Sequence, residues 1–283
     1  MKTAILIIIS VLATVPLYGQ AVYDFHSVNG TESSADAALD GWTVADHYGT
    51  SNYQDYVGEV GLIFADQSSY SSISGTPRGA FRGDSGDTYA NKLGLHAFCI
   101  DSETTFLGPE TTSIQSYRPY TLAAAEQRFT DEGIVGYTPG GLKRAAYLLE
   151  QNFDQMLTGG NLGSATMQAA IWEVLTDTNL NLSLGQGNYY LRNNTGNSTY
   201  NQRANDMIAL ANTWFAAAKN DNWGGANHKP DNEVIFWLDP NDLMNNQSVM
   251  SLNIEGLGNT PVPEPSTSLL MAMGSLVLLR RRR

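Results

Sequence analysis

Basic residues are scarce in this sequence, and their scarcity limits the partners it can have. The 283 residues include 16 Lys and Arg against 28 Asp and Glu, which gives a formal net charge of -12. Lys2 and the arginines at 280–283 lie in the terminal segments, so the central part of the chain is more acidic still. Because no basic face is left to neutralise phosphates, nucleic acid is excluded as a partner.

Cysteine is scarcer still, because Cys99 is the only one in the chain. A single cysteine cannot close an intramolecular disulfide, which excludes a small fold held together by disulfides. The rest of the composition, with 42% hydrophobic residues, 27 Gly and 16% charged residues, is typical of one or two compact domains with many turns. A chain of this length is long enough to bury a core without covalent staples.

The N-terminal segment 1–21 has the pattern of an export signal. Lys2 provides the positive charge, an apolar run follows, and Gly19 and Ala21 are small residues at the spacing that signal peptidase reads. We therefore expect residues 1–21 to be a signal peptide. A free thiol outside the cell is liable to oxidation, so we also expect another group to occupy the sulfur of Cys99.

The C-terminal segment 259–283 has three consecutive parts. Pro263, Glu264 and Pro265 are followed by an apolar stretch at 269–279 and then by the four arginines. This order resembles the PEP-CTERM sorting signal. The apolar stretch is shorter than the roughly 20 residues that a helix needs to cross a bilayer.

The resemblance to this sorting signal implies a processing partner and a destination. It implies cleavage by an exosortase-type membrane enzyme of a Gram-negative bacterium, with transient membrane contact through residues 266–279. Delivery would be to the cell surface or the extracellular matrix. The alternative interpretation is a plain C-terminal anchor, held in orientation by its positive charges.

Residues 22–258 are predicted to form the folded domain, in the order strands, helices, strands. Alternating and apolar runs bounded by turn residues predict strands at 22–25, 41–44, 56–64, 93–100, 233–238 and 248–254. Helical periodicity predicts helices at 121–129, 141–157, 164–175 and 203–219. The domain is thus β-rich over 22–100, helical over 120–219 and closed by strands over 233–254.

Two motifs are of chemical interest, one on the strand before the helical part and one on a helix within it. Cys99 lies at the end of an apolar strand and is followed by Ile100 and Asp101. In the predicted helix 164–175, the apolar stripe of Met167, Ala170, Ile171 and Val174 is expected to face a core, and Gln168 lies off that stripe.

Together these motifs resemble the thioester domain of bacterial surface adhesins. The aromatic-Cys-Ile-Asp segment around Cys99 and the Gln-x-Ala-Ile-Trp segment that begins at Gln168 are similar to the family's two motifs. In that family the cysteine sulfur condenses with the glutamine amide, releases ammonia and leaves an internal thioester. The resemblance implies that Cys99 and Gln168 form this bond, supported by Ala170, Ile171, Trp172 and Asp101.

The resemblance also implies a fold and a function. The expected fold is α+β, a β-barrel or β-sandwich with an inserted helical subdomain. The expected function is adhesion, in which an amine or hydroxyl on a target protein or exopolysaccharide attacks the thioester and is captured covalently. Such capture happens once per molecule, so the chain is not expected to be an enzyme, and no cofactor or metal is implied. Ser102 departs from the family pattern, which often has proline after the aspartate.

The predicted helix boundary has a chemical consequence for Gln168. A helix that starts near Ser164 places Gln168 in its first turn, where free N–H groups and the positive dipole end would polarise the amide. Trp172, one turn later, is expected to shield the thioester from water.

The sequence alone offers three alternatives. In the first, Cys99 and Gln168 form ordinary packing in a noncatalytic matrix or glycan-binding module, for which the 14 Tyr and 5 Trp would supply stacking surfaces. A Cys-His hydrolase built on His96 is disfavoured, because residues three apart on a strand point to opposite faces. A calcium loop starting at Asp177 is rejected, since Leu182 stands where the loop needs glycine.

Overall fold

The computed structural model describes residues 22–29, 41–48, 51–67, 75–83, 91–101, 114–132, 137–192, 196–225, 228–240 and 247–254. The predicted signal peptide 1–21, the sorting signal 259–283 and Ser102 lie outside these residues. One compact unit spans Val22–Leu257.

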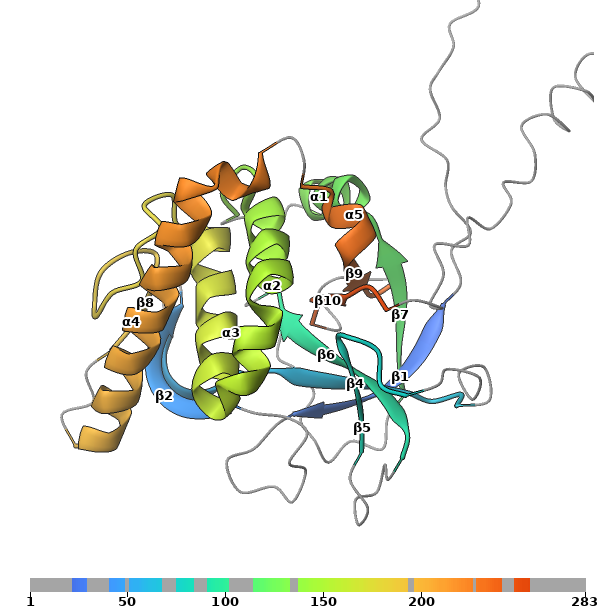
Figure 1. Ribbon diagram of the computed structural model, residues 1–283, viewed down its shortest axis with the longest axis horizontal. Helices are drawn as coiled ribbons and strands as arrows, with labels where there is room; N and C mark the ends of the chain where they lie inside the picture. The colour runs from blue at the N-terminus through green and yellow to red at the C-terminus, as the bar shows by residue number, and fades with distance from the viewer. Residues whose placement is uncertain are drawn as a thin grey trace, which may run out of the picture. The chain divides into compact units, whose positions relative to one another are not determined.

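Six strands form a closed antiparallel β-barrel (Figure 1). In the order in which they pair, they are β10 (Val249–Leu252), β9 (Val234–Leu238), β7 (Ile114–Tyr120), β1 (Tyr23–Asn29), β4 (Val60–Phe64) and β6 (Leu93–Cys99). The barrel closes because β10 also pairs with β6, with Val249 opposite Cys99. The short β5 (Ala80–Arg82) pairs with the first half of β6, at Leu93–Leu95. The α+β barrel class is thus confirmed, and the sandwich alternative falls because the sheet has no open ends.

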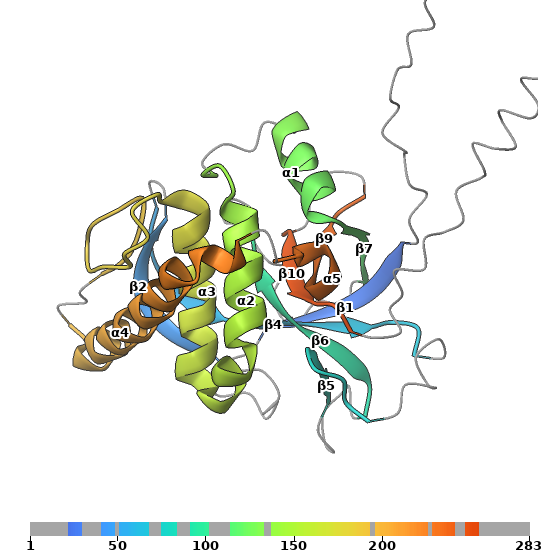
Figure 2. The same ribbon diagram turned by 45° about the horizontal axis from the view of Figure 1, so that its top comes forward.

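A helical layer lies beside the barrel, with α2, α3 and α4 side by side (Figures 1 and 2). The helices are α1 (Leu122–Asp131), α2 (Gly141–Thr158), α3 (Gly160–Thr176), α4 (Ser198–Asn220) and the single turn α5 (Pro230–Glu233), with the 3-10 turn η2 (Asn222–Gly224) after α4. A second antiparallel sheet of β3 (Ser51–Gly58), β2 (Gly41–Tyr48) and β8 (Tyr189–Leu191) packs against α3.

Several predicted boundaries are corrected. The single strand expected at 56–64 is two strands in different sheets, because the chain passes from β3 to β4 at Glu59. β5, β7 and β8 were not predicted; the two three-residue strands are too short to show a period. Thr121 is the N-cap of α1, and its hydroxyl oxygen accepts a hydrogen bond from the N–H of Ala124. This cap explains where the helix starts.

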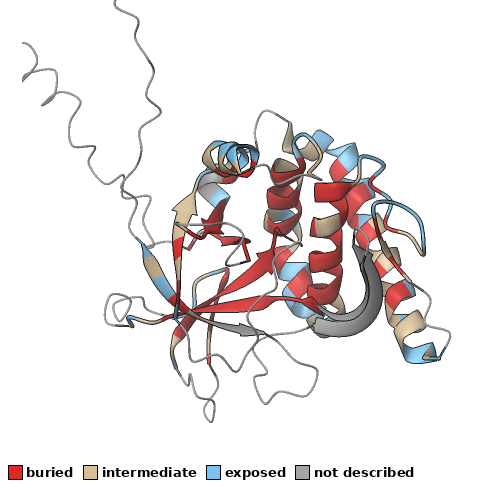
Figure 3. Ribbon diagram, turned by 180° about the vertical axis from the view of Figure 1, so that it is seen from behind, coloured by how far each residue is buried: buried red, intermediate tan, exposed pale blue. Residues whose placement is uncertain are grey.

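The helix α3 is the central element of the helical layer. Most of its residues are buried, as the nearly continuous red of this helix shows in Figure 3. The predicted stripe is buried, but Ala165 and Ala169 on the other side are buried as well. A helix buried on all sides has no solvent face, since α2, α4, β2 and β3 surround it.

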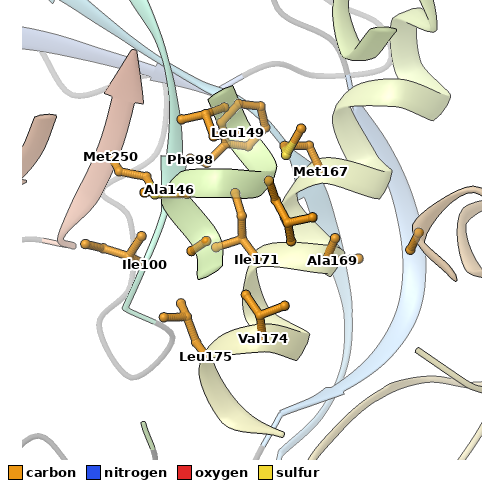
Figure 4. Packing of buried hydrophobic residues seen from close by; sticks show 14 of the residues in the cluster. Phe98, Ile100, Ala146, Leu149, Met167, Ala169, Ile171, Val174, Leu175 and Met250 are labelled. Atoms are coloured by element: carbon orange, nitrogen blue, oxygen red, sulfur yellow. The ribbon is translucent and has the colours of Figure 1, made fainter. Parts of the chain in front are cut away.

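The two faces of β6 belong to different cores. Leu93, Leu95, Ala97 and Cys99 pack inside the barrel. Phe98, followed by Ile100 just beyond the strand, packs on the opposite face against the helices. Figure 4 shows this second face, where Phe98 and Ile100 lie near Ile171 and Val174 of α3. The strand that carries Cys99 is therefore the wall between the two cores.

Candidate functional site

The sharp connection between α2 and α3 places Gln168 in the site. Only Gly159 separates the helices, and Gly160 has a φ of 55°, which favours glycine. A Cβ on Gly163 would lie 2.1 Å from the carbonyl oxygen of Met156, so glycine is needed for this close approach. The helix can therefore begin at Gly160, well before the predicted start.

The expectation that Gln168 lies in the first turn of its helix is consequently wrong. Gln168 lies in the interior of α3, and its side chain is 1% exposed. The free N–H groups of the helix start and the positive dipole end are confined to the first turn. They do not reach the Gln168 amide, whose oxygen accepts a hydrogen bond from a different donor.

That donor is the main chain of Cys99. The Cys99 N–H donates to Oε1 of Gln168 over 2.8 Å. The Gln168 Nε2 donates in turn to the carbonyl oxygen of Cys99, also over 2.8 Å. The amide of Gln168 thus pairs with the end of β6 as a neighbouring strand would, across a sequence separation of 69 residues. Both sides of the amide are held against one residue, and that residue carries the only thiol.

The thiol of Cys99 sits in an apolar environment. Cys99 is 6% exposed and packs with Val60, Trp237 and Val249 in the barrel core. Burial, and next the nearby charge of Asp101, raise the pKa of the Cys99 thiol far above its ordinary value. The thiol is therefore neutral at physiological pH and is a weak nucleophile until a proton is removed.

The four predicted supporting residues are all near the pair, with different surroundings. Ala170 and Ile171 are fully buried and pack in the helical core. Trp172 is partly buried, contacts both cores, and its ring meets Tyr189 edge-on at 5.5 Å. Its Nε1 is buried and has no hydrogen-bond partner among the described residues. Asp101 is 1% exposed and supplies the charge that acts on Cys99.

The chain beyond Cys99 is held by residues that the sequence did not single out. The Tyr137 hydroxyl donates to the carbonyl of Ile100, and the Ile100 N–H donates to the carbonyl of Ser248. The side-chain amide of Gln247 donates to the carbonyl of Asp101 over 2.5 Å. These contacts come from two separate segments, at 137 and 247–248, so only the folded chain reveals them. They fix the backbone whose N–H binds Gln168.

His96 is engaged away from the thiol. Its Nδ1 lies 2.5 Å from Oε2 of Glu59, and both side chains are almost fully buried. The imidazole also lies against the rings of Phe81 and Phe153. The disfavoured Cys-His hydrolase thus lacks the hydrogen-bonded pair that such chemistry needs. Glu59 was missed, although an acid in the middle of the apolar run 56–64 is itself an unusual signal.

The expectations on the calcium loop, metal ligands, membrane-spanning helices and aromatic surfaces can be compared with the residues that the structure describes. The Asp177 carboxylate accepts hydrogen bonds from the N–H groups of Asn179 and Asn188 and thereby closes its own loop. Within the described ranges no group of three or more His, Cys, Asp or Glu is arranged to hold a metal ion. No helix of the described part is long and apolar enough to cross a membrane. Among the aromatic side chains whose burial the structure describes, none is fully exposed.

Comparison with known proteins identifies the C-terminal segment. Residues 261–283 match the family model for the PEP-CTERM protein-sorting motif. The chain therefore carries an exosortase-dependent sorting signal and is exported to the cell surface. No curated protein and no solved structure matches the chain.

Proposed function

We propose that this exported surface protein stores an internal thioester between Cys99 and Gln168 and uses it to capture a nucleophile covalently. The single observation that carries the proposal is the pair of hydrogen bonds, each 2.8 Å long, between the Gln168 amide and the main chain of Cys99. They place a buried amide beside the only cysteine of the chain.

Formation of the bond is a condensation that needs no oxidant. The Cys99 sulfur attacks the amide carbon of Gln168, the carbon–nitrogen bond breaks, and the thiol proton leaves with the nitrogen as ammonia. A primary amide is a poor electrophile, so the two groups must be held in contact. The N–H of Cys99 supports the step, because it already donates to the oxygen that becomes negative.

Capture of the target breaks the thioester. An amine of the target attacks the Gln168 carbonyl carbon, the carbon–sulfur bond breaks, and the amine proton ends on the Cys99 sulfur. The product is an amide between the target and Gln168. The new amide is substituted on nitrogen, so a further attack by the Cys99 thiol would have to expel the bound target instead of ammonia. Each molecule therefore reacts once, as a covalent adhesin rather than an enzyme.

Protection from water is the second requirement of such a site. Gln168 and Cys99 are both buried, and Trp172 closes one side by contacting the barrel core and the helical core together. A thioester in this position would hydrolyse slowly because water has little access. Replacement of Trp172 by Ala should speed hydrolysis without preventing formation of the bond.

The sorting signal supports a surface target. A protein delivered to the outside of the cell meets amines and hydroxyls of proteins and exopolysaccharides, which are the nucleophiles that a thioester accepts. We extend the proposal to the surface or matrix of a Gram-negative bacterium, with residues 1–21 removed after export and residues 266–279 in transient contact with the membrane. The folded domain is then 22–258.

The decisive experiment is the intact mass of purified protein comprising residues 22–262, before and after addition of methylamine. We expect a starting mass one ammonia below the sequence mass, uptake of one methylamine, and the appearance of one titratable thiol. Cys99→Ala and Gln168→Ala should each remove both the mass deficit and the uptake. A mass equal to the sequence mass, with a titratable thiol from the start, would refute the thioester and favour a noncatalytic matrix or glycan-binding module.

A further inference from the structure

A second polar site lies where α2, η2 and α5 meet. It is a pocket of about 320 Å³, lined by Tyr147, Glu150, Gln151, Asp221, Gly224, His228, Lys229 and Glu233. This volume is at the small end of the range for ligand pockets. The lining contains three carboxylates and one lysine, so its charge is negative when His228 is neutral.

The backbone on one side of the pocket adopts an uncommon conformation. Asn222 and Trp223 have φ values of 49° and 53°, and Gly224 follows with a φ of 70°. A Cβ on Gly224 would lie 2.7 Å from the Cβ of His228 and 3.1 Å from the Tyr147 ring, so glycine lets these two side chains pack on the turn. Tyr147 donates its hydroxyl to Asp221 over 2.6 Å, which holds the wall together.

His228 is the side chain whose hydrogen bonding is incomplete. Its Nδ1 lies 3.2 Å from Oε2 of Glu150, while its side chain is only 3% exposed. Its Nε2 is buried and has no partner among the described residues. Because the carboxylate of Glu150 is an acceptor, the ring proton is on Nδ1, and Nε2 of the neutral ring accepts. Burial lowers the pKa of His228 and so favours the neutral ring, although Glu150 acts in the opposite direction.

We propose that this pocket binds a primary ammonium group, such as the end of a lysine side chain or a small amine. The described lining offers acceptors on Glu150, Asp221, Glu233 and the incomplete His228, and an ammonium group offers three donors with a positive charge. The pocket is independent of the thioester, because none of its residues belongs to the Cys99 and Gln168 site.

The test uses protein with Cys99→Ala, so that no thioester can consume the amine. n-Butylammonium is titrated into this protein, with 1-butanol as the uncharged probe of equal chain length, and the ring nitrogens of His228 are followed by NMR. We expect saturable shifts with butylammonium and none with butanol. Absence of saturable binding, or equal shifts with the two probes, would overturn the proposal. Because the thioester is absent from this protein, the result does not depend on whether covalent capture occurs.

Substitutions on one helix provide the matched control. Glu150→Gln should weaken butylammonium binding about tenfold, because a charged acceptor is lost. Asp154→Asn, one turn further along α2 and outside the pocket, should change it less than about twofold, since an exposed charge is screened by solvent. Glu233→Gln changes an exposed side chain and should leave the stability of the fold unchanged. It should weaken butylammonium binding about threefold. Equal effects of all three substitutions would overturn the proposal by showing general surface attraction.

Discussion

Two buried polar contacts join the barrel strands to the start and the middle of α3, and they differ in what they leave unbonded. At the first, Glu59 pairs with His96 on β6, and the Glu59 N–H donates to the Ser164 hydroxyl over 3.0 Å. At the second, Gln168 pairs with the main chain of Cys99. At the first contact the two side chains bond to each other. The second uses only the backbone of Cys99, so its thiol is not consumed by the contact.

This difference leaves the Cys99 thiol available for the reaction proposed above, whereas the Glu59 and His96 side chains bond to each other. A buried ionisable pair is costly to leave half-made, and its members are held by each other and by Ser164. A neutral amide bonded to a backbone costs less to bury, and in the thioester proposed above it would supply the electrophilic carbon. Similar burial on one strand is therefore compatible with a contact that stabilises the fold and with the proposed thioester. The substitutions below should therefore divide into those that change stability and those that change chemistry.

The largest loss of stability is expected from His96→Ala. It removes the imidazole from the buried Glu59 carboxylate, which should lower the free energy of unfolding by about 3–5 kcal/mol. Urea denaturation measures this loss. The mass deficit of one ammonia should persist in the molecules that fold. If His96→Ala abolished the deficit in folded protein, the first contact would belong to the chemistry and the comparison would fail.

The next effect concerns Glu173, on another side of α3. Burial is the main cause that raises the pKa of Glu173 to about 7 from its ordinary 4.5, and Asp177 adds to it while the Asn181 N–H and Lys219 oppose it. The folded state therefore binds the proton more tightly than the unfolded state. Stability from this group is fully present below pH 4.5 and is lost as the pH rises through 7.

Replacement of Glu173 by Gln tests this sign. Between pH 4.5 and pH 8 the unmodified protein should lose on the order of 2 kcal/mol of unfolding free energy that the variant keeps. Parallel urea titrations at the two pH values measure the difference, and groups common to both proteins cancel. Amine uptake should be the same in both. A variant less stable than the parent at pH 8 would contradict the assignment.

A smaller loss is expected from Gly163→Ala. The added Cβ would meet the Met156 carbonyl oxygen at 2.1 Å, so the α2 and α3 hairpin must open slightly, at a cost of about 1–3 kcal/mol. Thermal unfolding of the variant gives the size of the effect. Ala165→Gly is the control for a glycine exchange in the same helix, with a loss of about 1 kcal/mol from helix propensity. Equal stability of Gly163→Ala and the parent would mean that the hairpin is not tightly packed there.

Cys99→Ala should have the smallest effect on stability and the largest effect on amine capture. Loss of one buried sulfur should cost about 1 kcal/mol, by analogy with a buried methylene group. Amine capture should be lost completely. Denaturation and intact mass on the same preparation provide both measurements. Residual capture would place the nucleophile elsewhere and end the contrast between the two contacts.

The sequence alone was sufficient for the features that depend on local pattern. The amphipathic run at 141–157 predicted α2 to within one residue at its end, because its apolar period is unbroken. The strand at 93–100 and the sorting signal were predicted for the same kind of reason, and residues 261–283 match the sorting family. The bond between Cys99 and Gln168 was predicted from a resemblance and stays a prediction; the structure shows the Gln168 amide hydrogen-bonded to the main chain of Cys99.

Contacts between distant segments were decided only by the tertiary structure. The closed barrel depends on β10 pairing with β6, and the true start of α3 depends on how closely Gly163 approaches Met156. Neither leaves a local period in the sequence. The donor to Gln168 is the Cys99 N–H, a group that every residue except proline has, so no residue type could reveal it. The sequence therefore determined which side chains could react, while packing decided which backbone group holds them in place.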